Sequence, residues 1–117
     1  MAAAALTPEL ALRYLGELST DIRAAVLLAP DGSLAASDPA EPGLGELLRE
    51  QVTALLGAAD GAWEPVAEVE ATMPAGSVFA VRHAGWVLAV VAGRYALSSL
   101  MRYDLHHVVT ELEGDGE

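Results

Sequence analysis

Two adjacent histidines near the C-terminus, His106 and His107, come closest in this sequence to a pair of metal ligands. Asp104 and Glu111 lie near them in the chain. Neighbouring residues of a helix point about 100° apart, so two adjacent imidazoles do not chelate one ion, and the i, i+4 spacing of helical zinc pairs is absent. Asp104 with His107 would hold a metal only weakly. The pattern therefore favours surface or interface histidines, and we expect neither a metal nor a cofactor.

Nucleophilic and nucleotide chemistry find little support in the sequence. Ser98, Ser99 and Thr110 stand outside any Gly-x-Ser-x-Gly motif, and the chain has no cysteine. The chain has no Gly-x-x-x-x-Gly-Lys-Ser/Thr loop, so it is not itself a GTPase. Arg94 precedes a predicted helix, where an arginine could reach a partner's nucleotide or, more readily, form a surface ion pair. We therefore expect no catalytic residues and a protein that is not an enzyme.

The composition indicates a single, acidic, interacting domain. At 117 residues the chain is one domain by length, with an ordered core expected over about 7–112 and a disordered acidic tail at 113–117. Hydrophobic residues make up 53% of it, which is high and indicates that a partner, most simply a second copy, buries some apolar surface.

Charge and hydropathy narrow the choice of partners and compartment. The net charge is −11, with no lysine, so binding to nucleic acid and attraction to anionic lipid are both disfavoured. A partner with a basic surface fits better, although the charge is also explained, and more simply, by a role in solubility alone. The chain has no apolar run of membrane-spanning length and no secretory leader, so we expect no membrane insertion and a cytoplasmic location.

The elements that would position any site follow from hydrophobic periodicity. The order predicted is helix, two strands, helix, three strands, helix, over residues 8–19, 22–29, 33–37, 43–56, 66–73, 77–83, 86–92 and 97–112. This order builds an α+β fold with one antiparallel sheet and helices on its faces. Pro30-Asp31-Gly32 predicts a tight hairpin turn, and Gly57 to Gly61 predicts a loop that ends the second helix.

Periodicity also predicts which surfaces are buried. In the first helix, Leu10, Tyr14 and Leu18, with Ala11 and Leu15 beside them, form the stripe expected to face the sheet. Strands 22–29 and 86–92 are apolar on both faces and should be central and adjacent. Strand 66–73 alternates apolar residues with glutamates and Thr72, which indicates an edge strand with one wet face.

The strand-turn-strand IRAAVLLAPDGSLAAS, the leucine-rich second helix and the stretch GSVFAVRHAGWVLAVVAGRYALSSLMRYDLHHVVTEL together resemble the Roadblock (dynein light chain roadblock-type) domain family. The resemblance covers about residues 7–112 and consists of the order and spacing of elements. It implies a profilin- and longin-like α-β-β-α-β-β-β-α fold, with the first and last helices on one face of a five-stranded antiparallel sheet and the second helix on the other. Roadblock-type domains typically dimerise through the third strand and second helix, and many bacterial and archaeal members accompany small Ras-like GTPases.

The residues at the corresponding positions suit a two-fold interface, because an unpaired edge strand and a wide leucine stripe both need a cover. The second helix and the chain that leads into the third strand supply the expected interface residues, which are Leu44, Leu47, Leu48, Gln51, Val52, Leu55, Trp63, Val66, Glu68, Val69, Glu70, Ala71 and Met73. Glu68 and Glu70 could repel their symmetry mates, unless the register separates them or an arginine such as Arg82 neutralises them.

Two functions from different classes follow. The first is a non-enzymatic homodimeric adaptor or regulator, with a small Ras-like GTPase as the partner implied by the resemblance. The second is a small-molecule-sensing or ligand-binding module, since folds of this size also hold ligands between sheet and helix. A ligand module needs convergent polar groups within apolar walls, and the central strands offer almost none, which favours the adaptor.

Overall fold

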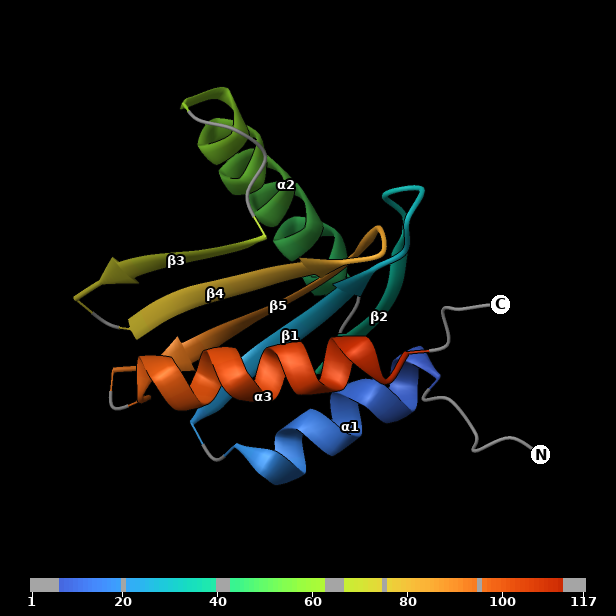
Figure 1. Ribbon diagram of the computed structural model, residues 1–117, viewed down its shortest axis with the longest axis vertical. Helices are drawn as coiled ribbons and strands as arrows, with labels where there is room; N and C mark the ends of the chain where they lie inside the picture. The colour runs from blue at the N-terminus through green and yellow to red at the C-terminus, as the bar shows by residue number, and fades with distance from the viewer. Residues whose placement is uncertain are drawn as a thin grey trace.

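In the computed structural model, eight elements follow one another in the predicted order (Figure 1). The structure describes residues 7–19, 21–39, 43–62, 67–74, 76–94 and 96–112. The elements are α1 (Pro8–Leu18), β1 (Ile22–Leu28), β2 (Leu34–Asp38), α2 (Leu44–Ala62), β3 (Glu68–Met73), β4 (Gly76–His83), β5 (Trp86–Gly93) and α3 (Ser98–Thr110). The predictions for the N-terminal residues 1–6 and for the tail lie outside the described residues.

The five strands form one antiparallel sheet in the order β2-β1-β5-β4-β3. The predicted central pair is confirmed, because β5 lies between β1 and β4, and β1 lies between β2 and β5. The predicted edge position of β3 is also confirmed. Its ladder with β4 runs in unbroken register from Glu68 opposite Val81 to Met73 opposite Gly76. Both strands that read as apolar on both faces therefore have a neighbour on each side.

Two tight turns hold the sheet in register. In the β1–β2 turn, Asp31 Oδ1 accepts hydrogen bonds from the backbone N–H of Ser33 at 2.9 Å and from its hydroxyl at 2.6 Å. These bonds lower the pKa of the Asp31 carboxyl. In the β4–β5 turn, Ala84 and Gly85 both have positive φ, 51° and 88°, as a two-residue hairpin requires. A Cβ at Gly85 would come within 2.9 Å of Pro30 Cβ, so this turn packs tightly on the other.

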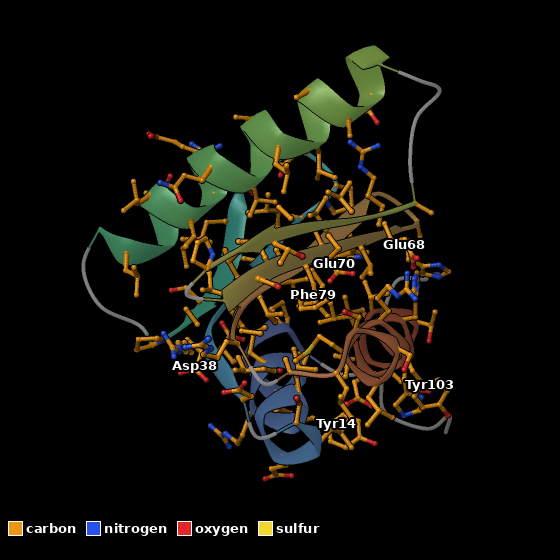
Figure 2. All side chains as sticks on the ribbon, turned by 90° about the vertical axis from the view of Figure 1, so that its left-hand side faces the viewer. Tyr14, Asp38, Glu68, Glu70, Phe79 and Tyr103 are labelled. Carbon is orange, nitrogen blue, oxygen red and sulfur yellow. The ribbon has the colours of Figure 1, made fainter. Side chains whose placement is uncertain are left out.

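The helices form a layer on each face of the sheet, with α1 and α3 on one face and α2 on the other (Figures 1 and 2). Each face has its own apolar core. The larger core lies under α1 and α3 and contains Phe79, Leu15, Leu88 and Leu105. The smaller core lies under α2 and is formed by Val26, Leu28, Val52, Leu56, Ala80 and Ala89. Alternation along each strand supplies both cores, since successive side chains point to opposite faces.

The buried stripe of α1 differs from the prediction. Ala11, Leu12 and Leu15 are buried, whereas Leu10 and Leu18 are 44% and 40% exposed. The helix lies on the sheet beside α3, so Leu12 faces the sheet and Tyr14 turns toward α3. Tyr14 Oη is 3.3 Å from Nε2 of His107. The predicted periodicity was right, but the helix is rotated because it has two neighbours instead of one.

The second helix is longer than predicted. It continues through Gly57 and Gly61 to Ala62, although glycine inside a helix costs about 0.5–1 kcal/mol relative to alanine. Tertiary contacts favour the extra turns. Asp60, in the added segment, forms a bidentate ion pair with Arg82 of β4 at 2.7 and 3.1 Å. The predicted loop at residues 57–61 is therefore wrong.

Candidate functional site

The two histidines considered as metal ligands, His106 and His107, contact different residues. His106 Nε2 lies 2.7 Å from Glu68 Oε1, whereas His107 contacts Tyr14. The two adjacent imidazoles thus face different neighbours, as their helical offset predicts. Within the described ranges, no three His, Asp or Glu side chains are grouped closely enough to hold a metal ion.

The candidate nucleophiles are likewise engaged in local contacts. Ser98 donates a hydrogen bond to Glu70 Oε2 at 2.8 Å, and Thr110 donates to the backbone carbonyl of His107 at 2.9 Å. In the part of the chain that the structure describes, neither hydroxyl hydrogen-bonds to a histidine side chain. The Ser98 hydrogen bond links α3 to the edge strand β3, and the Thr110 hydrogen bond lies within the last turn of α3.

An apolar groove lies between α2 and the sheet, near the edge strand β3. Its volume is about 200 Å³. One wall consists of Leu48, Gln51, Val52 and Leu55 of α2. Small side chains of the sheet form the floor, among them Ala24, Ala71, Ala89, Val78 and Val91. In Figure 2, α2 runs obliquely above the sheet, so the helix does not cover the whole face.

The groove brings together part of the predicted interface set. Leu48, Gln51, Val52, Leu55 and Ala71 line it. Val69 packs against the apolar core under α2. Leu44 is half-buried at the start of α2, and Leu47 is 50% exposed. Met73 pairs with Gly76 at the end of β3, while Trp63 and Val66 lie outside the described residues. The structure therefore places the described α2 members, together with Val69 and Ala71 of β3, on one side of the sheet.

Glu68 and Glu70 point to the other side of the sheet, toward α3 (Figure 2). Arg102 Nη1 of α3 lies 3.3 Å from Glu68 Oε2, and His106 lies against the other oxygen of the same carboxylate. Arg82, the arginine that the sequence suggested for this role, pairs with Asp60 on the α2 side, and Arg102 is the arginine that pairs with Glu68. The pairing partners come from α3, which the sequence did not place beside β3.

Sequence reasoning missed the floor of the groove. Ala24 and Val91 belong to strands that read as nearly continuous apolar runs, so no alternation distinguished the two faces. The small size of Ala24 and Ala71 was the available signal. Short side chains on one face of a sheet leave room that a helix at a normal packing distance does not fill.

Among the described residues, no helix is long and apolar enough to cross a membrane. The sequence matches no protein-family model and none of the curated proteins. Solved structures do match. Acanthamoeba castellanii profilin IB superposes with a TM-score of 0.54 at 14% identity, covering 83% of this chain and 89% of the profilin. The chain thus has a profilin-like α+β fold.

Within this fold class, several bacterial structures have a higher TM-score than the profilin, and two of them illustrate the match. A Roadblock/LC7 domain from Streptomyces avermitilis has a TM-score of 0.76 at 21% identity, covering 92% of this chain and 93% of that domain. The gliding protein MglB from Thermus thermophilus has a TM-score of 0.71 at 14% identity, covering 96% of this chain and 92% of MglB. The fold is that of the Roadblock/LC7 domain, as the sequence resemblance implied.

Proposed function

We propose that the chain is a homodimeric, non-enzymatic adaptor or regulator that dimerises through β3 and α2. The observation that carries this proposal is the apolar groove beside an edge strand. An edge strand offers backbone N–H and C=O groups to another strand, and an open apolar groove offers area to a second helix. One two-fold axis satisfies both needs, since pairing β3 with its mate brings the second α2 toward the first.

The side chains of the proposed interface fit this arrangement. Leu44 and Leu47 are partly exposed beside the groove, although each is a large apolar residue. In a β3–β3 pair, Glu68 and Glu70 would lie on the α3 side of the joined sheet, away from the leucines. Arg102 pairs with Glu68 there and Ser98 donates a hydrogen bond to Glu70, so both carboxylates already have a partner within the chain. We include Trp63, Val66 and Met73 in the interface on the sequence argument.

The ligand-binding alternative is less well supported. Of the described side chains that line the groove, Gln51 alone is polar. A site that recognises a small molecule needs several convergent polar groups to orient it. An apolar groove with one amide suits a protein partner better, because burial of apolar area is the main favourable term in association.

A small Ras-like GTPase is the partner that we propose for the dimer, on the strength of the Roadblock resemblance. Roadblock-type domains accompany such GTPases in many bacteria, and this chain has no phosphate-binding loop of its own. A scaffold that presents two copies of one surface would hold or position the GTPase instead of replacing its chemistry. We also propose that the protein acts in the cytoplasm.

Two measurements test the two parts separately. Sedimentation equilibrium at tens of micromolar should give twice the 12.1 kDa of one chain, and a single-chain mass would refute the dimer. Co-elution with the Ras-like GTPase encoded in the same genomic neighbourhood should then be assayed, once with GDP and once with a non-hydrolysable GTP analogue. Binding in at least one nucleotide state is expected. If neither form binds, the GTPase part is wrong while the dimer stands.

A further inference from the structure

Large apolar side chains remain exposed on the face of the molecule that carries α1 and α3. Leu97, Leu100 and Tyr103 are 64%, 57% and 68% exposed. Leu10 and Leu18 of α1 add to them, and among the described residues only Leu47 of α2 is a comparably exposed large hydrophobic elsewhere. We call the set Leu10, Tyr14, Leu18, Leu97, Leu100 and Tyr103 the α1–α3 surface. It lies across the sheet from the α2 groove.

The two helices present their apolar residues side by side. Leu10, Tyr14 and Leu18 recur every four residues on α1, so they share one side of that helix. On α3, the ring of Tyr103 stacks on His107 with centroids 6.3 Å apart and planes 3° from parallel. The same histidine lies against Tyr14. Figure 2 shows Tyr14 and Tyr103 on neighbouring helices of this face. His107 thus joins the two apolar stripes.

A hollow of about 220 Å³ opens where the end of α1 meets the start of α3. Leu18, Leu97, Leu100 and Met101 supply its apolar lining. An apolar cavity of about 150 Å³ accommodates a benzene ring, so this hollow has room for one bulky side chain. The antiparallel helices diverge at this end in Figure 1. No side chain of the described residues fills this depression.

The charge of the hollow has one sign. Among the described residues that line it, Asp21 and Asp104 are charged, and none is an arginine or a histidine. Within the described chain, Asp104 forms no hydrogen bond or ion pair. A carboxylate beside an apolar depression favours a ligand with a cationic group next to an apolar side chain. The net charge of −11 also attracts a basic partner at longer range.

We propose that the α1–α3 surface binds an amphipathic, basic helical segment of a partner protein. The segment inserts one bulky apolar side chain into the hollow and sets arginine or lysine against Asp104. A second copy of this surface is disfavoured as the occupant, since the aspartates of two copies would approach each other. An anionic membrane is disfavoured by the same charges. The surface is separate from α2 and β3, so the proposal does not depend on the dimer.

The test uses two synthetic helix-forming peptides with the same leucine and phenylalanine stripe. One carries arginines along both flanks and the other carries glutamates at the same positions. Titration into ¹⁵N-labelled protein should give chemical-shift changes on α1 and α3 with the basic peptide only. L100E should abolish these changes. D104R should weaken the basic peptide by about tenfold or more and strengthen the acidic one.

Controls separate a specific site from general charge attraction. E50R makes the same charge change on an exposed position of α2, across the sheet, and should leave both affinities within about twofold. Circular dichroism establishes that L100E, at a surface position, stays folded. The proposal is wrong if neither peptide binds, if E50R acts like D104R, or if the shifts map to the α2 groove. It is also wrong if anionic vesicles compete for the surface, or if L100E changes the oligomeric state.

Discussion

Enlarging Ala71 should have opposite effects on one chain and on the proposed dimer. Ala71 lies on β3 and forms part of the groove beneath α2, with Leu48 and Leu55 on the opposite wall. In an isolated chain, a leucine at this position would extend into the 200 Å³ of open space. In the proposed dimer, the second α2 would take the same space. The A71L variant therefore distinguishes a groove that is a packing defect of the single chain from a groove that forms half of a dimer interface.

The magnitude of both effects of A71L can be estimated from the volume of the groove. Leucine adds three carbons, and each buried methylene contributes about 0.8 kcal/mol. The groove is open at one side, so we expect about 1–2 kcal/mol of added stability for the single chain. Overpacking of a filled interface costs about 1–3 kcal/mol per copy. Because both copies carry the substitution, the dissociation constant should rise by tenfold or more, each 1.4 kcal/mol being a factor of ten.

The assay combines urea unfolding of dilute protein with sedimentation velocity over a range of concentrations. T53L is the control, because Thr53 is exposed on the flank of α2 beside Asp60 and Arg82, away from Leu47 and Gln51. Its effect on each measurement should stay within about 0.5 kcal/mol. The reasoning would be refuted by an A71L variant that dimerises as tightly as the parent. A loss of stability in the single chain would refute the claim that the groove is open.

Three further predictions concern the fold that carries both surfaces. F79A should lower the free energy of unfolding by about 3–5 kcal/mol in urea titrations, because Phe79 is 1% exposed beneath α1 and α3. G85A should lower the melting temperature, since φ is +88° and the new Cβ would meet Pro30; an unchanged value would contradict the turn geometry. S33A should raise the pKa of Asp31 toward its ordinary value in an NMR titration, because both Ser33 hydrogen bonds favour the carboxylate. The stabilising effect of these bonds is fully present above about pH 4 and is lost as pH falls through the lowered pKa, so acid unfolding should depend less on this carboxyl in S33A.

The α2 groove could be predicted from the sequence, whereas the α1–α3 surface could not. Leucines at helical spacing on α2 and an alternating strand at β3 pointed to an interface, and the structure places Leu48, Leu55 and Ala71 around one groove. The hydrophobic periodicity of α1 led to the wrong prediction for the α1–α3 surface. Leu10, Tyr14 and Leu18 form an apolar stripe that ordinarily faces a core, and only the position of α3 shows that the stripe lies at the margin of the core.

The sequence alone predicted the order of the elements, the central and edge strands, the hairpin turn at Asp31 and the fold class. These features depend on the local period of apolar residues and on turn residues a few positions apart, so they can be read within short windows. Three features required the tertiary structure: the rotation of α1, the pairing of Glu68 with α3 and the extension of α2 through Gly57. Each depends on contacts between residues far apart in the chain, such as Asp60 with Arg82. The energies of these contacts override local propensity, and a short stretch of sequence gives no indication of them.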